Sequence, residues 1–142
     1  MKFPFGTRIR QLLARLGWGA GETLGARGER IASEFLESQG YCVQSRNFRV
    51  RGGEADIIAT KDGLVVVVEV KTRSIDRFGS PAQAVNERKA RRVIRAGQTF
   101  CRGTGLSLSK IRFDVVAVEW PRGGGEPKIR HYLGAISSRR SR

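Results

Sequence analysis

Histidine and cysteine are scarce in this sequence, and their scarcity excludes several classes of site. The 142 residues include one histidine and two cysteines. Cys42 and Cys101 lie far apart, with no C-x-x-C motif and no histidine at ligand spacing. These features argue against a zinc site and against catalysis by histidine. Both cysteines are expected to be reduced and partly buried in a cytoplasmic protein.

Long apolar runs and acidic residues are also few. No apolar run approaches the roughly 20 residues of a membrane-spanning helix. Lysine and arginine total 27 against 13 acidic residues, which gives a formal net charge of +14. Such an excess favours a polyanionic partner, with nucleic acid first and an anionic membrane second. A basic protein without such a partner is the alternative on charge alone.

The length suits one domain with a real core. Residues 1–24 form a basic segment in which arginines interrupt the apolar positions, so it does not read as a secretory signal. We expect an appended helix or arm that contacts nucleic acid or the domain surface, with a membrane-surface helix as the alternative. Residues 25–120 would form the domain, and residues 121–142 a glycine-rich connector, a short strand or turn, and a basic tail.

The clearest turn signal is Asp62-Gly63, which suits a type I′ hairpin because that turn needs positive φ at both central residues. The run from Leu64 to Val70 is almost entirely apolar and β-branched, which is typical of a central strand buried on both faces. A two-residue turn pairs Lys61 with Leu64. The pattern therefore predicts a β-hairpin over residues 53–73.

The same register gathers charged side chains. Counting back from the turn, Asp56 falls opposite Glu69 and Glu54 falls opposite Lys71, all on one face. Directly opposed residues lie about 5 Å apart, so three carboxylates and one amine would cluster. A three-residue loop would instead shift the register by one and turn Glu69 away from Asp56.

Two interpretations fit this cluster. In the first, it is a structural ion pair in which Lys71 neutralises one acid, but at least one carboxylate then stays uncompensated. In the second, Asp56 and Glu69 hold a divalent cation, Mg²⁺ or Mn²⁺, because such ions take carboxylate oxygens and keep several waters. The excess of carboxylates and the cost of burying Glu69 favour the metal.

A helix is predicted over residues 25–39, with Gly40 as the residue that ends it. Glu29 lies at the edge of the apolar stripe of this helix. On helical pattern alone, a solvated acid in the first turn is the better interpretation of Glu29.

A second helix is predicted from the N-cap Ser80 and Pro81 to about Phe100. Its basic face favours contact with phosphates over ordinary solvation. That face consists of Arg88, Lys89, Arg91, Arg92 and Arg95.

Further strands are predicted at residues 41–50 and 111–120. A strand, helix and strand in this order imply a right-handed parallel crossover, so the fold class is α/β with a central mixed sheet and helices on both faces. Asp114 would lie within the sheet and is interpreted as structural, paired with an arginine.

An ordered set of motifs gives this sequence a family resemblance. It resembles the PD-(D/E)xK nuclease superfamily and, within it, the uncharacterised bacterial YraN-like family, which is similar in pattern to archaeal Holliday-junction resolvases. The resemblance covers about residues 25–120. The motifs are Gly28-Glu29 with Ala32, Arg46-Asn47, Gly53-Glu54-Ala55-Asp56, Val68-Glu69-Val70-Lys71-Thr72-Arg73, Phe78-Gly79 and Arg112-Phe113-Asp114-Val115-Val116.

The resemblance implies a restriction-endonuclease-like fold and a metal-dependent endonuclease acting on nucleic acid, with structured or branched DNA favoured over RNA. Asp56 and Glu69 would bind Mg²⁺ or Mn²⁺, and Glu29 would join them directly or through water. Lys71 would position the attacking water or stabilise the charge that develops on the phosphate. Its amine lies near two carboxylates and should stay protonated, which favours the electrostatic role.

The remaining candidates would support substrate binding. Glu54 would assist Lys71, and the helix after the catalytic strand would turn Gln83 and Lys89 toward the site. A symmetric homodimer would suit a junction substrate. The alternative is a non-catalytic nucleic-acid-binding protein on a nuclease fold. The candidate contacts to flanking phosphates are Arg73, Arg88, Lys89 and Arg92.

Overall fold

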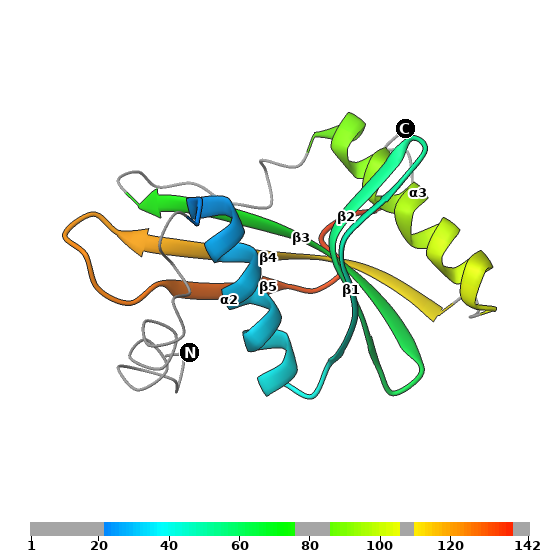
Figure 1. Ribbon diagram of the computed structural model, residues 1–142, viewed down its shortest axis with the longest axis horizontal. Helices are drawn as coiled ribbons and strands as arrows, with labels where there is room; N and C mark the ends of the chain where they lie inside the picture. Colours follow the sequence, from blue (N-terminus) through cyan, green and yellow to red (C-terminus); the bar gives the residue numbers. More distant parts are fainter. Residues whose placement is uncertain (1–21, 76–85, 106–109, 138–142) are drawn as a thin grey trace.

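The computed structural model describes residues 22–75, 86–105 and 110–137. Within them five strands form one sheet in the order β1-β2-β3-β4-β5. Neighbouring strands are antiparallel except β3 and β4, which are parallel, so the predicted α/β fold with a mixed sheet is confirmed. In chain order the elements are α2 (Leu24–Ser38), β1 (Cys42–Val50), β2 (Gly53–Lys61), β3 (Leu64–Ile75), α3 (Glu87–Thr104), β4 (Ile111–Pro121) and β5 (Lys128–Tyr132) (Figure 1).

The predicted hairpin between β2 and β3 is confirmed. Asp62 and Gly63 both have positive φ, 50° and 78°, and Lys61 pairs with Leu64. Strand β3 is central, and its residues from Val65 to Val68 are at most 1% exposed. Turn chemistry and the β-branched run thus set the register that brings the candidate residues toward one another.

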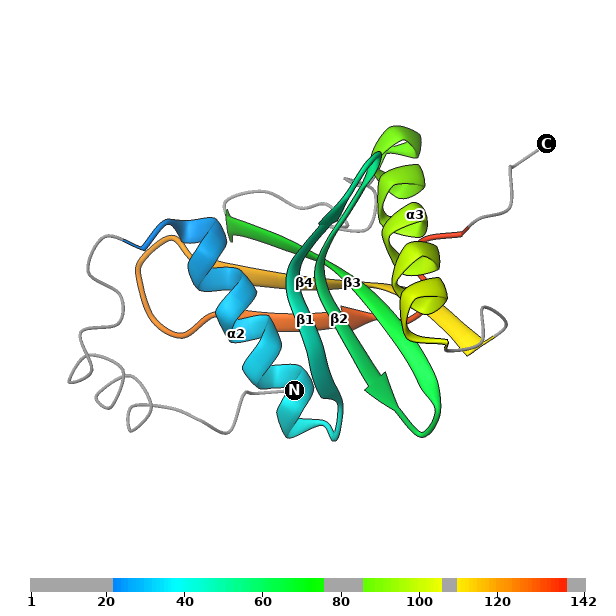
Figure 2. The same cartoon turned by 45° about the vertical axis from the view of Figure 1, so that its right-hand side comes forward.

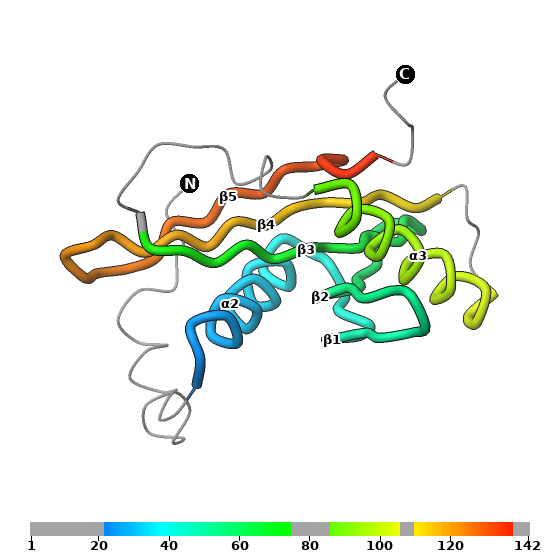
Figure 3. The backbone as a smooth tube through the Cα atoms, turned by 90° about the horizontal axis from the view of Figure 1, so that it is seen from above, coloured from blue at the N-terminus to red at the C-terminus, as the bar shows by residue number. Residues whose placement is uncertain are grey.

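Helices cover both faces of the sheet. Ala32 and Leu36 of α2 pack with Val66 and Val68, whereas α3 packs against Val65 and Val67 on the other face. This alternation along β3 is the period-2 pattern of a strand buried on both sides. Figure 3 shows the two helices against different parts of the sheet, with α3 beside β2 and α2 beside β3 and β4.

Helix α3 differs from its prediction at both ends. It begins at Glu87 because Asn86 has an extended backbone and caps it, with the Asn86 side chain accepting a 2.9 Å hydrogen bond from the Lys89 N–H. A continuous helix from Pro81 to Phe100 is therefore wrong, and the helix runs on to Thr104. The predicted N-cap Ser80 and the candidate Gln83 lie outside the described residues.

Asp114 is the predicted structural acid, and its arginine partner is Arg112. The Arg112 Nε–Asp114 Oδ1 distance is 2.8 Å. His131 Nε2 lies 2.8 Å from Asp114 Oδ2, and the Gly134 N–H donates a 2.8 Å hydrogen bond to Asp114 Oδ1. Burial would raise the pKa of Asp114, but the hydrogen bonds from His131, Arg112 and Gly134 lower it. This network fastens β5 to β4, and Arg112 also reaches the Tyr41 hydroxyl before β1.

The structure bears on the remaining sequence-based expectations in different ways. Cys101 is buried as expected, whereas Cys42 on the edge strand β1 is exposed. Strand β3 continues past residue 73, where the predicted hairpin ends, to Ile75, because it stays paired with β4. No helix in the described ranges is long and apolar enough to cross a membrane. Most of the predicted N-terminal arm, residues 1–21, lies outside these ranges.

Candidate active site

The candidate site lies where β2 separates from β3. Their pairing runs from Lys61 opposite Leu64 to Ile57 opposite Val68. At the next position the backbone ladder gives way to a side-chain contact, in which the Val70 N–H donates a 2.7 Å hydrogen bond to Asp56 Oδ2. Figures 1 and 2 show the β1–β2 hairpin turning away from β3 beyond this point. The predicted pairing of Asp56 with Glu69 is thus replaced by an opening that Asp56 borders.

Glu69 lies on β3 beside this opening between the strands, and it is buried, with 4% of its surface exposed. Its Oε1 lies 3.5 Å from Lys89 Nζ and 3.8 Å from Lys71 Nζ. Its Oε2 is buried without a hydrogen-bond partner among the described residues. Burial, and then the charge of Asp56, raise the pKa of Glu69 to about 7, although Lys89 and Lys71 act in the opposite direction. Glu69 is therefore a carboxylate whose charged form is only partly compensated.

Glu29 reaches the same cluster from helix α2. Burial, followed by the charge of Asp56, raises the pKa of Glu29, while a hydrogen bond from Asn47 lowers it. Gly28, the preceding residue, allows α2 to approach β3, since an added Cβ would lie 2.9 Å from Thr72 Cβ. Glu29 and Glu69 therefore each lie close to Asp56. This position of Glu29 agrees with the family resemblance and differs from the solvated position that helical pattern alone favoured.

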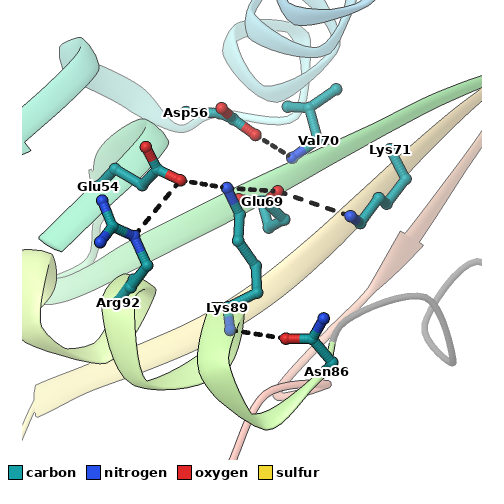
Figure 4. A network of polar contacts seen from close by, with 8 residues as sticks. All are labelled: Glu54, Asp56, Glu69, Val70, Lys71, Asn86, Lys89 and Arg92. Carbon is teal, nitrogen blue, oxygen red and sulfur yellow. Dashed lines mark hydrogen bonds and ion pairs between the residues drawn. The ribbon is translucent and has the colours of Figure 1, made fainter.

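Glu54 has different partners from the predicted one. Lys89 Nζ donates a 2.6 Å hydrogen bond to Glu54 Oε1, and Arg92 Nε lies 3.7 Å from the same oxygen (Figure 4). The hydrogen bond from Lys89 lowers the pKa of Glu54. The predicted support of Lys71 by Glu54 is wrong, because β2 has left β3 at this level and Glu54 reaches α3 instead.

The basic candidates fall into an inner and an outer set. Lys89 lies inside the cluster between Glu54 and Glu69, whereas Arg88 is exposed on the outer face of α3. Burial opposes the charge of Lys89, but Glu54, Glu69 and Asp56 raise its pKa. Arg73 lies near Glu119, with an Nη2–Oε1 distance of 3.7 Å. The one local signal for this placement of Lys89 is Asn86, which fixes the start of the helix.

The donor set fits a small hard cation with few protein ligands. Asp56 and Glu69 supply carboxylates, and Glu69 Oε2 is a buried acceptor that no residue within the described ranges hydrogen-bonds. Mg²⁺ commonly binds through one or two carboxylates and keeps its waters. Across the described ranges, no group of three or more His, Cys, Asp and Glu side chains converges closely enough to hold a metal. Glu29 therefore fits a link through water better than direct ligation.

Comparison with known proteins shows the family of this chain. The model of the uncharacterised protein family UPF0102 matches residues 28–118, a range that includes every described candidate residue. A UPF0102 protein of Leifsonia xyli is 38% identical, over 81% of this chain and 97% of the relative. One of Clavibacter michiganensis is 43% identical, over 76% and 91%. One of Symbiobacterium thermophilum is 45% identical, over 68% and 81%. The resemblance to the YraN-like family is thus confirmed, and the chain belongs to the uncharacterised protein family UPF0102.

Proposed function

We propose that this protein is a metal-dependent endonuclease that hydrolyses phosphodiester bonds in nucleic acid, with structured or branched DNA as the favoured substrate. One observation carries the proposal: Glu69 is buried close to Asp56, and one of its carboxylate oxygens has no hydrogen-bond partner in the described part of the chain. A fold retains such a group at a cost in stability unless a cation compensates it. Strongly perturbed carboxylates at an opening in a sheet are typical of functional sites.

Asp56 and Glu69 would hold Mg²⁺ or Mn²⁺, with Glu29 joined through a water molecule. When bound, the ion would polarise the phosphate and lower the pKa of a water so that it can attack near neutral pH. The Val70 N–H donates a hydrogen bond to one oxygen of Asp56, so the backbone of β3 holds this carboxylate in place at the proposed site. Burial of Glu69 keeps water away from the ligand and strengthens its attraction to a cation.

Lys71 would act on the phosphate. It lies two residues after Glu69 on β3, so both side chains point to the same face of the sheet. Its ammonium is 3.8 Å from Glu69 Oε1, and 27% of its side chain is exposed. This position suits a cation that stabilises the negative charge developing on a phosphate oxygen in the transition state.

The outer cations would position the substrate. Arg88 is exposed, and Arg73 and Arg92 are 37% and 39% exposed at their side chains. Contacts from such arginines to phosphates orient a nucleic acid without reading its bases. We therefore expect recognition of shape or branching over recognition of sequence.

Cleavage of a substrate panel tests the proposal. Labelled single-stranded, duplex, flap and four-way DNA, together with structured RNA, would be incubated with Mg²⁺, Mn²⁺ or EDTA. We expect cleavage that requires metal and is lost in Asp56→Asn. The matched control is Asp62→Asn, because Asn-Gly is as good a type I′ turn as Asp-Gly and this residue is remote from the opening.

The alternative function is nucleic-acid binding without catalysis. The observation in its favour is that Lys71 and Lys89 already lie near Glu69 and partly neutralise it. Tight, salt-sensitive binding with no cleavage of any substrate in either metal would support this alternative and would sink the nuclease proposal.

A further inference from the structure

The ammonium of Lys89 lies between two carboxylates, and only one of them belongs to the proposed metal site. Lys89 Nζ is 2.6 Å from Glu54 Oε1 and 3.5 Å from Glu69 Oε1 (Figure 4). We propose that Lys89 is a counter-cation of Glu69 that a divalent metal ion can replace. This proposal rests on the proposed metal role of Glu69. Lys89 compensates Glu69 in the metal-free protein and withdraws to Glu54 when a divalent cation binds.

Burial explains why a counter-cation is needed. The side chain of Glu69 is 5% exposed, and Asp56 is close enough to disfavour its charge further. Without a metal, compensation must come from a proton or from neighbouring ammonium groups. Both Lys71 and Lys89 lie within 4 Å of Glu69 Oε1.

The two lysines differ in their freedom to leave. Lys71 is on the same strand and face as Glu69 and forms an ion pair with it, so the strand backbone keeps the two side chains close together. Lys89 comes from α3 and already makes its shorter contact with Glu54. Its side chain has a flexible four-carbon stem, whereas its backbone N–H is fixed by the cap residue Asn86. Lys89 can therefore leave Glu69 by a side-chain rotation while keeping one carboxylate partner.

A bound divalent cation would make this rotation favourable. The cation and the Lys89 ammonium would both seek Glu69, and like charges at such separations in a half-buried site repel strongly. Lys89 can keep its ion pair with Glu54 while it lies away from the metal position, which limits the repulsion between its ammonium and the metal ion. Lys89 thus lowers the affinity for metal, and Glu54 reduces that effect.

Metal affinity of the full chain tests the exchange directly. Binding of Mn²⁺ would be followed by the electron paramagnetic resonance of free Mn²⁺ at about pH 8, where protons compete least with the metal. We expect Lys89→Met to bind Mn²⁺ roughly five- to tenfold more tightly than wild type. Arg91→Met is the matched control, because Arg91 is exposed on the same helix and pairs with Glu87, and its affinity should change less than about twofold.

A second variant distinguishes the movement of Lys89 to Glu54 from the simple effect of a nearby charge on metal affinity. Glu54→Gln removes the destination of Lys89 and should weaken Mn²⁺ binding, whereas Glu54→Gln in the Lys89→Met background should change the affinity less than about twofold. Far-ultraviolet circular dichroism and thermal unfolding would verify the fold of each variant.

The possible failures are distinguishable. Equal Mn²⁺ affinity in wild type and Lys89→Met would overturn the exchange and leave the metal site intact. An equal effect of Glu54→Gln with and without Lys89 would also overturn it. No measurable Mn²⁺ binding by any variant, including wild type, would overturn the proposed metal role itself and the exchange with it.

Discussion

Among the single residues of this protein, Glu69 connects stability most closely with the proposed chemistry. Its carboxylate is buried, one oxygen has no partner among the described residues, and Asp56 adds a second negative charge nearby. The folded chain therefore disfavours the ionised form that a metal would need. If the proposed cation binds here, it should stabilise the folded protein, because it would compensate this buried charge.

The pH dependence of stability follows from this residue. The pKa of Glu69 is about 7 in the folded protein, against an ordinary value of 4.5. Between these values the folded state binds more protons than the unfolded state, so the free energy of unfolding falls as the pH rises through this window. In EDTA we expect a loss of ~1–3 kcal/mol between about pH 5 and about pH 8, measured by urea unfolding.

The isosteric variant Glu69→Gln isolates that contribution. It should remove most of the decline, leaving a smaller one from Glu29, whose pKa is also raised. Glu126→Gln, an exposed glutamate in the glycine-rich connector, is the control and should retain the wild-type decline. An unchanged decline in Glu69→Gln would show that the buried carboxylate is not its origin.

Between elements, the packing of α2 on β3 sets the position of Glu29. Gly28 faces Thr72 so closely that an added Cβ would overlap the threonine side chain. We expect Gly28→Ala to lower the free energy of unfolding by ~1–3 kcal/mol, because the helix must move to accept the methyl group. Chemical denaturation measures this.

Gly25→Ala on the same helix is the matched control for Gly28. A Cβ at Gly25 meets nothing within 4 Å. The better helix propensity of alanine should therefore stabilise the protein by up to about 1 kcal/mol. Equal effects of the two substitutions would contradict close packing of α2 at Gly28.

The Asp114 network predicts a separate stability effect between β4 and β5. Asp114→Asn leaves Arg112 and His131 without their charged partner, so we expect a loss of ~3 kcal/mol near neutral pH. Because folding lowers the pKa of Asp114, its contribution is present above the ordinary value of 3.8 and is lost as the pH falls further. Thermal unfolding at neutral and acid pH checks this, and a change under about 0.5 kcal/mol would contradict it.

Local chemistry predicted the hairpin, and tertiary contacts decided where it ends. Asp62 and Gly63 specify the turn, and the turn specifies the register as far as Ile57. The departure of β2 from β3 depends on the Asp56 carboxylate taking the Val70 N–H, and no short pattern encodes this choice. The register obtained by counting back from the turn therefore holds as far as Ile57 and fails for the predicted pairs of Asp56 and Glu54.

The placement of α3 was the harder part to predict. Ser80-Pro81 is a stronger helix start in sequence than Asn86, yet Asn86 caps the helix that carries Lys89. Lys89 and Glu54 lie 35 positions apart. Their contact exists because α3 packs on the face of the sheet toward which β2 diverges. A contact between residues so far apart in the sequence depends on how the helix packs on the sheet. Composition and periodicity do not predict that packing.

Across the whole molecule, the excess of positive charge bears on binding. The formal net charge is +14, and α3 exposes several arginines. If Arg88 contacts a phosphate, Arg88→Met should weaken binding and reduce the slope of log affinity against log salt by about 1. Arg102→Met at the far end of α3 is the control. Equal slopes in wild type and Arg88→Met, measured by fluorescence anisotropy, would exclude Arg88 from the phosphate contacts.

The central claim is that the buried Glu69 and the half-buried Asp56 form a metal-dependent cleavage site. The most direct measurement follows cleavage and binding of one four-way DNA junction by wild type and Glu69→Gln, with Mg²⁺ and with EDTA. The account predicts that wild type cleaves only with Mg²⁺, and that Glu69→Gln binds the junction with similar affinity and loses cleavage by at least about a hundredfold. Equal cleavage per bound junction in the two proteins would contradict it.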